Sequence, residues 1–403
     1  MNPLKTLCFR IYQKSVFLAQ TLLRFKVPET LEGEGALKKI PSLLQKQGKA
    51  KPLVVSGSHP LKNGDMDKLT KPLEEAGINY VLFPEAKADS PFPVIEKAYS
   101  LYVCEHCDCL IAFGGGSAMD TAKAIGAKAS RPSRPLSSFK GVLKVRKRIP
   151  YLIAIPTTAG SGSEATLAAV VMNPSNHDKF AINDPVLIPS LAVLDPSLLA
   201  SLPKPLIAST GMDALTHAVE SYIGRARSRL SKKTALEAMA LIKDNLVRFY
   251  ESPSSPESAL AMQKAAYLAG VSFTRGYVGY VHALAHSLGG YYGVPHGLAN
   301  AVLLPFVLNS YGKKAHRKLN DAAISLGLAE KGSPKKEGAE RFISWVKRLN
   351  EKLAIPSSFS GVIIDADLNK LASHAEKEAN PLYPVPKEMN ADELKEILLE
   401  VKD

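Results

Sequence analysis

The sequence predicts two domains, an α/β domain with a mostly parallel sheet followed by an all-helical domain. Short apolar runs bounded by turn residues alternate with helical stretches in the first half, as in a doubly wound sheet. Past LDPSLLASLPKP these runs stop, and apolar residues recur at helical spacing up to the C-terminus. Strands are expected at about 53–57, 79–83, 109–113, 151–155 and 191–194.

The helical half is expected to begin near residue 200, where Pro203 and Pro205 open its first helix. Later helices are predicted at LSKKTALEAMALIKDNLVRFY, ERFISWVKRLNEKL and ADELKEILLEV, with SPSSPES as a loop between helices. Asn390 and Glu393 have the spacing of a capping box for the last helix. The predicted domains are thus 27–200 and 201–403, preceded by an extension, 1–26.

The extension is basic and contains no Asp or Glu. Such a segment can lie on an anionic membrane surface, dock on its own protein or act as a targeting segment. We expect docking, because its apolar residues approximate one helical stripe. The stripe comprises Leu4, Leu7, Ile11, Leu18, Leu22 and Phe25, and it is broken only around Lys14 and Ser15.

Two motifs in the helical half gather residues that can bind a divalent metal ion. In STGMDALTHAVESY, Asp213 and His217 stand four residues apart, so both project from one face of a helix. In VHALAHSLGGYYGVPHG, His282 and His286 repeat this spacing, and His296 is expected in a loop or at a helix start. Ordinary core or surface histidines are the alternative. A buried carboxylate needs a cation or strong donors, and this favours the metal site.

A glycine turn in the α/β half is suited to a dinucleotide pyrophosphate. In CLIAFGGGSAMDTAKAIGA, Gly114, Gly115 and Gly116 separate a buried strand from a helix that opens at Ser117. Glycines admit a ligand close to the backbone, and the N–H groups of a helix start attract phosphate oxygens. The turn is neither a G-x-G-x-x-G fingerprint nor a P-loop, so a purely structural turn is the alternative. The next strand, YLIAIP, leads into TTAGSGSEAT, and both turns are expected at the carboxyl edge of one sheet.

Four segments resemble signatures of the iron-containing (group III) alcohol dehydrogenases: IPTTAGSGSEAT, LDPSLLASLP, STGMDALTHAVESY and HALAHSLGGYYGVPHGLANAVLLP. The resemblance extends from about residue 27 to the C-terminus. It implies a dinucleotide-binding α/β domain and an all-α metal-binding domain, the dehydroquinate synthase-like architecture, with the active site in the cleft between them. It also implies a homodimer.

The resemblance also assigns roles to individual residues. It makes Asp213, His217, His282 and His296 the metal ligands, and His286 a histidine near the nicotinamide that relays a proton. The alternative is that His286 only forms hydrogen bonds next to the metal ligands and takes no part in proton transfer. The implied cofactor-binding residues are Gly115, Gly116, Ser117 and Asp120 at the pyrophosphate turn, Thr157, Thr158, Ser161 and Thr166 in the second loop, Lys179 at a ribose, and Leu198 near the adenosine.

This ligand set predicts the reaction. Three imidazoles and one carboxylate suit Fe²⁺ or Zn²⁺, and the family name favours Fe²⁺. A bound cation lowers the pKa of an alcohol hydroxyl, so hydride can pass between a metal-bound alkoxide or carbonyl and the nicotinamide. The sequence therefore predicts a metal-dependent, NAD(P)-linked alcohol dehydrogenase or aldehyde reductase.

The residue that follows the first strand bears on whether the enzyme uses NAD or NADP. Where the family often has an Asp for the adenosine ribose, LVVSGSHP has Gly57. Losing the carboxylate removes repulsion against a 2′-phosphate, which favours NADP(H), with His59 or Lys62 as a phosphate partner. A shifted loop that brings Asp65 or Asp67 to the ribose is the alternative.

Composition narrows the class of protein. The four cysteines are too few and too unevenly spaced for a disulfide framework, which favours a reducing cytoplasm. No run of apolar residues is long enough to span a bilayer. CEHCDC lacks a second CxxC, so reduced cysteines are expected rather than a zinc site. The net charge of +13 is concentrated in an acid-free run between Asp120 and Glu164. No recognition motif accompanies the run, so a solvated basic surface, and no nucleic-acid partner, is expected.

Two other functions compete with the dehydrogenase. One is an NAD-dependent lyase or cyclase of dehydroquinate synthase type, which would recycle its cofactor within the site. The flanks STGMDALTHA and PHGLANA argue against it. The other is a basic binding protein whose metal is only structural.

Overall fold

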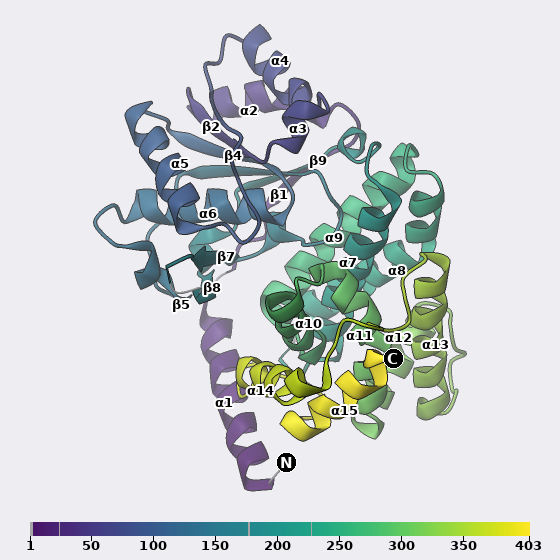
Figure 1. Cartoon of the computed structure of the whole chain (residues 1–403). Helices are drawn as coiled ribbons and strands as arrows, with labels where there is room; N and C mark the ends of the chain where they lie inside the picture. Colours follow the sequence, from purple (N-terminus) through teal and green to yellow (C-terminus); the bar gives the residue numbers. More distant parts are fainter. Residues whose placement is uncertain (1–2, 24, 176–177, 227) are drawn as a thin grey trace. The chain divides into compact units, whose positions relative to one another are not determined.

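The computed structural model describes residues 3–23, 25–175, 178–226 and 228–403. The chain forms two compact units, each of which is described by itself (Figure 1). The α/β unit comprises Arg24–Ser201 and Ser254–Gln263, and the helical unit comprises Met1–Leu23, Leu202–Pro253 and Lys264–Asp403.

A parallel sheet of six strands, within the described residues, organises the α/β unit in the order β1-β9-β6-β4-β2-β3. This confirms the predicted sheet class. Four of the strands are buried along most of their length, because helices cover both faces of the sheet (Figure 1). The strands are β1 (Glu29–Glu32), β2 (Pro52–Ser56), β3 (Val81–Phe83), β4 (Cys109–Gly114), β6 (Tyr151–Pro156) and β9 (Leu191–Leu194).

The sequence did not indicate β1 or a second, small sheet. β1 has the sequence ETLE and lies at the edge of the main sheet, where charged residues are tolerated. The second sheet has the order β5-β8-β7, with β7 (Ala168–Asn173) antiparallel to β8 (Asp178–Asn183) and β5 (Gly141–Val142) at its edge. β5 lies in the connection from α6 to β6, and β7 and β8 lie in the connection from β6 to β9, so the strand-helix alternation of the main sheet does not reveal them.

Helix α6 positions the first glycine turn. It runs along Gly116–Ser130 and buries small and apolar residues such as Ala118, Met119 and Ile125 against β4. The other helices of this unit are α2 (Ile40–Lys46), α3 (His59–Lys62), α4 (Asp67–Glu75) and α5 (Phe92–Cys104), and its 3₁₀ turns are η1 (Ala36–Lys39), η2 (Leu136–Phe139), η3 (Ser163–Ala165), η4 (Pro185–Leu187) and η5 (Pro196–Leu198).

The helical unit contains the predicted helices and no strand among its described residues. The helix predicted to open at Pro203 and Pro205 is α7, which begins at Lys204, and the capping box of Asn390 and Glu393 is confirmed. The predicted loop after residue 251 is shorter than expected, because α9 begins at Pro256. The helices are α1 (Pro3–Leu22), α7 (Lys204–Ile223), α8 (Arg229–Glu251), α9 (Pro256–Gly276), α10 (Tyr280–Tyr292), α11 (His296–Ser310), α12 (Lys313–Ser325), α13 (Lys335–Lys352), α14 (Leu368–Ala379) and α15 (Ala391–Lys402), with the 3₁₀ turn η6 (Asp365–Asp367). The first part of α9, up to Gln263, belongs to the α/β unit.

The N-terminal extension docks on the helical unit, but not through the predicted apolar stripe. Arg10 and Gln13 of α1 donate hydrogen bonds to backbone carbonyls of the segment 381–386, whereas Leu4, Leu7, Ile11 and Leu18 are exposed. The side chain of Leu22 lies outside the described residues, and Phe25 follows the helix. The docked face of α1 therefore carries polar side chains that satisfy backbone carbonyl groups. No helix within the described residues has the length and hydropathy required to cross a bilayer.

Candidate metal centre

Three helices of the helical unit bring the predicted metal ligands together. Asp213 and His217 lie one turn apart on α7, His282 lies in the first turn of α10, and His296 is the first residue of α11. The predicted helix start at His296 is therefore confirmed. One potential ligand atom from each of the four residues lies within 4.8 Å of those of the other three, and this is the metal-type cluster found among the described residues.

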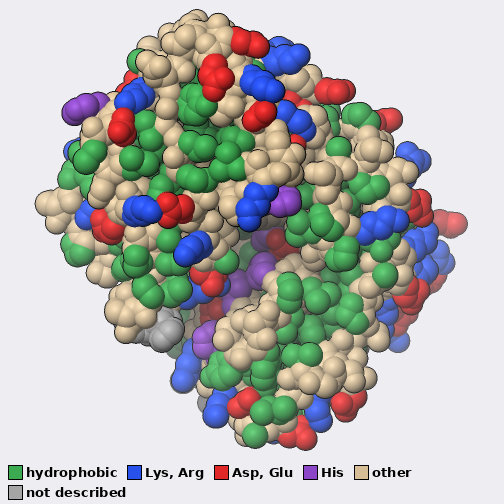
Figure 2. Space-filling view, turned by 45° about the horizontal axis from the view of Figure 1, so that its top comes forward, with side chains coloured by type: hydrophobic (Ala, Val, Ile, Leu, Met, Phe, Trp, Pro, Cys, Tyr) green, Lys and Arg blue, Asp and Glu red, His purple; other side chains and the backbone are tan. Residues whose placement is uncertain are grey.

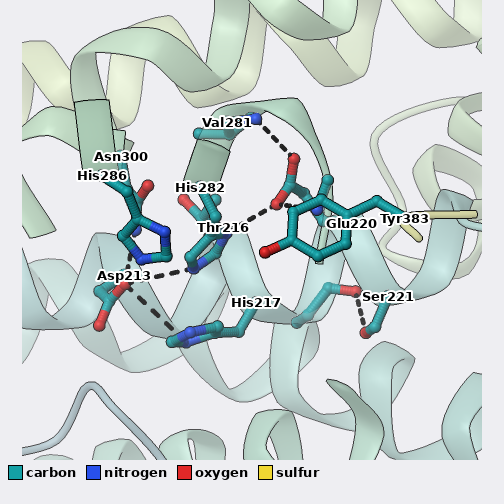
Figure 3. A network of polar contacts seen from close by, with 12 residues as sticks. Asp213, Thr216, His217, Glu220, Ser221, Val281, His282, His286, Asn300 and Tyr383 are labelled. Atoms are coloured by element: carbon teal, nitrogen blue, oxygen red, sulfur yellow. Dashed lines mark hydrogen bonds and ion pairs between the residues drawn. The ribbon is translucent and has the colours of Figure 1, made fainter. Parts of the chain in front are cut away.

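Asp213 lies at the centre of this cluster (Figure 3). Its Oδ1 atom is 3.9 Å from Nδ1 of His217, 3.8 Å from Nε2 of His282 and 3.5 Å from Nε2 of His296. Asp213, His217 and His282 are buried, whereas the side chain of His296 is 41% exposed. The cluster thus has a closed side formed by α7 and α10 and an open side at His296.

Glu220 fixes the orientation of the His282 ring. Its carboxylate lies 2.6 Å from Nδ1 of His282 and accepts hydrogen bonds from the backbone N–H groups of Gly279 and Val281, at 2.7 and 2.8 Å. Burial raises the pKa of Glu220 to about 7, although the backbone donors favour its charged form. With Nδ1 bonded to Glu220, Nε2 is turned towards Asp213.

The Nε2 atom of His282 tests whether the cluster fits a cation. This atom is buried and has no hydrogen-bond partner among the described residues. Burial, with the neighbouring histidines, lowers the pKa of His282 well below its ordinary value, so its ring is neutral and Nε2 carries a lone pair. A buried imidazole with one nitrogen held by a carboxylate and the other directed at a second carboxylate is the arrangement of a metal ligand.

Asn300 supports the cluster from α11. Its Nδ2 atom donates a hydrogen bond of 2.8 Å to Oδ1 of Asp213 and lies 3.1 Å from Nε2 of His296. Four residues separate Asn300 from His296, so the two side chains share one face of α11. The amide thereby ties the exposed histidine to the buried carboxylate.

His286 lies beside the cluster but outside the group of four. Its ring stacks on that of His296, with centroids 5.1 Å apart, and its side chain is 40% exposed. Nδ1 of His286 lies 2.7 Å from Oε1 of Glu378, which also accepts a hydrogen bond of 2.9 Å from the hydroxyl of Tyr383. Burial alone would raise the pKa of Glu378, but the charge of His286 and both hydrogen bonds hold it below its ordinary value. A carboxylate therefore orients the His286 ring.

The two predicted cofactor turns lie side by side in the α/β unit. Strands β4 and β6 are paired in parallel, with Gly114 opposite Pro156, so both turns leave the same edge of the sheet. Gly114 has φ +154°, and a Cβ atom there would lie 2.8 Å from that of Ala118. A Cβ atom on Gly115 would approach Oγ1 of Thr158 to 3.3 Å, and one on Gly116 would approach Oγ of Ser161 to 3.3 Å. Side chains larger than glycine would therefore close the space between the turns.

A buried lysine holds the second turn. Nζ of Lys123 donates to Oγ and the carbonyl of Ser163, to Oγ1 of Thr166 and to the carbonyl of Ala168, at 2.6 to 2.9 Å. Asp120 accepts hydrogen bonds from Oγ of Ser163 and from the backbone N–H of Val170. The side chains of Asp120 and Thr166 are thus engaged within the unit, where they shape the loop.

The other predicted cofactor residues differ in exposure. Thr157 donates its backbone N–H to the carbonyl of Gly114. Ser117, the predicted start of the helix, is the second residue of α6, which begins at Gly116. Leu198 is buried in η5. Lys179 is exposed on β8 and forms an ion pair of 2.6 Å with Asp89.

Gly57 directly follows β2, as predicted. A Cβ atom there would lie 3.6 Å from the carbonyl oxygen of Ala86, so the position can hold a side chain. Asp65 accepts hydrogen bonds from the side chains of Asn63 and Lys68, at 2.6 and 2.7 Å. These bonds argue against the alternative in which Asp65 replaces the missing carboxylate.

The remaining sequence features have ordinary structural explanations. The four cysteines are free thiols, and burial raises the pKa of Cys107 to about 11. In the basic run, Lys128, Arg131 and Arg134 donate hydrogen bonds to backbone carbonyls of the same segment. On the face shown in Figure 2, basic side chains alternate with acidic ones rather than forming one continuous patch.

Sequence reasoning missed several residues that complete these sites. Glu220 lies seven residues after Asp213 and Asn300 four after His296, so helical periodicity offered a signal for both. Glu378 and Tyr383 come from a distant segment, and no local pattern marks them. Lys123 was read as part of the basic run, although it is fully buried.

Comparisons with known proteins identify the family. The pattern of the iron-containing alcohol dehydrogenases matches residues 28–196, and that of the C-terminal part of the Fe-containing alcohol dehydrogenase family matches residues 207–401. The NAD-dependent methanol dehydrogenase of Bacillus methanolicus is 34% identical over 87% of this chain and 92% of its own length. The 1,3-propanediol dehydrogenase of Citrobacter freundii is 35% identical over 91% and 95%, respectively.

Solved structures agree with this assignment. The crystal structure of a 1,3-propanediol oxidoreductase superposes with a TM-score of 0.90 at 32% identity, covering 94% of this chain and 99% of the other. An alcohol dehydrogenase from Oenococcus oeni gives 0.89 at 31% identity, with the same coverage. The chain therefore belongs to the iron-containing alcohol dehydrogenase family and is an enzyme of that family.

Proposed function

We propose that the chain oxidises small alcohols, and reduces the corresponding aldehydes, with one divalent cation held by Asp213, His217, His282 and His296. The observation that carries this proposal is the buried Nε2 atom of His282, which faces the other three ligands without a hydrogen-bond partner among the described residues. One carboxylate and three imidazoles suit Fe²⁺ or Zn²⁺. The family description supports Fe²⁺.

The cation, when bound, would withdraw electron density from the substrate oxygen and so acidify an alcohol or polarise a carbonyl. The protein side chains set the geometry for this step. Glu220 keeps Nδ1 of His282 engaged, and Asn300 holds Oδ1 of Asp213, so two ligands are oriented before the cation arrives. The exposed side of His296 leaves room for the substrate.

His286 is proposed as the proton relay. Its Nδ1 atom is bonded to Glu378, so its Nε2 atom is the one that takes up the proton of the alcohol. Glu378 stabilises the resulting imidazolium, and Tyr383 keeps the carboxylate in place through its hydroxyl. A tautomer fixed by a carboxylate serves a relay better than a ring free to rotate.

The dinucleotide would bind at the two turns of the α/β unit and accept or return the hydride. The N–H groups at the start of α6, beside Gly115, Gly116 and Ser117, would hold the pyrophosphate. Thr157, Thr158 and Ser161 would face it from the second turn, whose shape depends on Asp120 and Thr166. Lys179 would contact a ribose after leaving Asp89, and Leu198 would pack near the adenosine.

Gly57 supports the use of NADP(H) as well as NAD(H). No side chain at this position repels a 2′-phosphate, and Asp65 is engaged by Asn63 and Lys68. Exposed His59 follows Gly57 by two residues, at the start of α3. The methanol dehydrogenase relative is named NAD-dependent, so both cofactors belong in the test.

Small primary alcohols are the proposed substrates, because the relatives are named for methanol and 1,3-propanediol. A homodimer in a reducing compartment completes the proposal. The family resemblance supports the dimer, and the four free cysteines support the compartment.

Anaerobic reconstitution tests the proposal. Metal-free protein is loaded with Fe²⁺ or Zn²⁺ and assayed with methanol, ethanol, 1,3-propanediol and their aldehydes, using both cofactors in each direction. Metal-dependent net change in reduced nicotinamide supports an alcohol dehydrogenase. Its absence with every substrate overturns the proposal and favours a cyclase, which regenerates its cofactor in each turnover.

A further inference from the structure

Helix α1 has a docked face and an exposed face. Polar side chains anchor the docked face: Arg10 donates a hydrogen bond of 2.8 Å to the carbonyl of Val385, and Gln13 donates to those of Pro381 and Tyr383, at 3.0 Å each. The apolar side chains of Phe9, Val16 and Phe17 are half-buried. Arg10 also pairs with the buried carboxylate of Glu388. Figure 1 shows α1 beside α14, within the same unit. The helix is therefore seated on the protein while Leu4, Leu7 and Leu18 are exposed.

The outward face of α1 is apolar. Leu4, Leu7, Ile11 and Leu18 are 69%, 56%, 58% and 66% exposed, respectively. Their spacing places them in one stripe along the helix, about 21 Å long at 1.5 Å per residue. Lys14 and Ser15 interrupt the stripe between Ile11 and Leu18. Isolated exposed leucines are common on protein surfaces, but four large aliphatic side chains exposed along one helix face indicate an interaction site.

Charge identifies the kind of partner. Residues 1–26 contain five basic residues and no acidic one: Lys5, Arg10, Lys14, Arg24 and Lys26. Lys5 and Arg10 are paired with Glu376 and Glu388. Lys14 is exposed, and helical geometry places it at the margin of the stripe. The whole chain carries a net charge of +13, so a second copy of α1 on this stripe would bring like charges together. An anionic surface is complementary both to the charge and to the apolar stripe.

We propose that α1 anchors the enzyme to the surface of an anionic lipid bilayer. The stripe of Leu4, Leu7, Ile11 and Leu18 enters the region between headgroups and acyl chains, and Lys14 lies at the lipid phosphates. Arg10 and Gln13 keep the opposite face on the protein, so the helix need not leave its seat in order to bind. The described helices lack the hydropathy to cross a bilayer, which limits α1 to lying on the surface.

Vesicle co-sedimentation of the full-length chain tests this anchor, after intact mass has verified residues 1–26. Neutral phosphatidylcholine vesicles are compared with vesicles containing about 30% phosphatidylserine. Binding is expected to be at least about tenfold stronger to the anionic vesicles and to fall at about 0.5 M NaCl, because salt screens the lysines. Equal binding to both vesicle types, or none to either, overturns the proposal.

A double variant distinguishes binding through the stripe from non-specific hydrophobic adsorption to vesicles. Leu7→Gln with Ile11→Gln is expected to weaken binding to anionic vesicles by about tenfold or more, while thermal unfolding and alcohol oxidation stay as in the parent. Leu230→Gln with Leu399→Gln is the matched control, since both leucines are exposed on other helices of the same unit, at 39% each. The control is expected to bind like the parent.

Light scattering of the same variants tests the alternative that a second copy of the chain covers the stripe. The Leu7/Ile11 variant is expected to keep the oligomeric state of the parent. If it dissociates instead, and the parent shows no vesicle binding, the stripe is an interface between copies and the lipid anchor is wrong. Vesicle binding that the double variant retains in full also overturns the proposal.

Discussion

Replacing Glu220 by Gln is expected to weaken metal binding by about 10- to 100-fold, although residue 220 does not itself belong to the ligand group. Its carboxylate serves three donors: the backbone N–H groups of Gly279 and Val281 and the Nδ1–H of His282. An amide of the same size has one oxygen. The substitution therefore removes an acceptor without creating a cavity.

The magnitude follows from how those donors are distributed. Oε2 accepts from Gly279 and His282, and Oε1 accepts from Val281. If the amide oxygen of Gln takes the place of Oε2, the N–H of Val281 faces the NH₂ group. If the amide oxygen takes the place of Oε1, the N–H of Gly279 and the Nδ1–H of His282 face the NH₂ group instead. Each buried donor left without an acceptor costs about 1 to 3 kcal/mol. If the His282 ring rotates to relieve this mismatch, its Nε2 atom turns away from Asp213 and from the cation. Because a tenfold loss of affinity corresponds to about 1.4 kcal/mol, the cost of one unmatched donor accounts for a loss of about 10- to 100-fold.

Competition with a chromogenic chelator measures the affinity, below the onset of thermal unfolding in each variant. Asp244→Asn is the matched control, because this exposed carboxylate on α8 pairs with neighbouring Lys243 and lies outside the cluster. The control is expected to bind metal like the parent. An unchanged dissociation constant in the Glu220→Gln variant would refute the view that Glu220 orients His282 for a cation.

Four further predictions follow from the same geometry. His217→Ala removes one ligand and is expected to abolish both bound metal and turnover; retention of stoichiometric iron or zinc, measured by elemental analysis, contradicts the ligand assignment. Gly57→Asp is expected to shift the NADPH/NADH ratio of kcat/KM towards NADH, because the new carboxylate repels a 2′-phosphate; an unchanged ratio argues against Gly57 as the determinant. Glu378→Gln is expected to lower kcat by about 10- to 100-fold with little change in the KM for cofactor, measured in steady state, and an unaltered kcat would remove Glu378 from the relay. Burial raises the pKa of Glu164 to about 7 from an ordinary 4.5, so the native chain binds more protons than the unfolded chain between these values and loses stability as pH rises through them. Glu164→Gln is expected to flatten that decline in melts recorded at about pH 5 and 7, and an equally steep decline in the variant would contradict it.

The elements with a clear sequence period were predicted well. Asp213 and His217 share a helix face because four residues make about one turn, and the cluster follows from that spacing together with the second histidine motif. Strands β4 and β6 were recognisable as buried runs, and parallel pairing of successive strands placed their turns at one edge. In both cases local geometry carries the information.

What the sequence left open depends on contacts between distant segments. Glu378 meets His286 across 92 residues of chain, and no periodicity links the two. Lys123 belongs to a basic run that suggests solvent, yet its neighbours in space are carbonyls and hydroxyls that satisfy a buried ammonium. The stripe of α1 suggested an apolar seat, but the docking surface offers carbonyl groups and so selects Arg10 and Gln13. Which face of an isolated amphipathic helix is covered is decided by its partner, which the helix sequence does not contain.

The measurement that tests the central claim most directly is anomalous diffraction at the iron edge from crystals reconstituted anaerobically with Fe²⁺. The account predicts a single strong peak at about 2.0 to 2.2 Å from Nε2 of His282 and from one ligand atom of each of the other three residues. An active, iron-dependent enzyme with its peak elsewhere, or with none at this cluster, would contradict it.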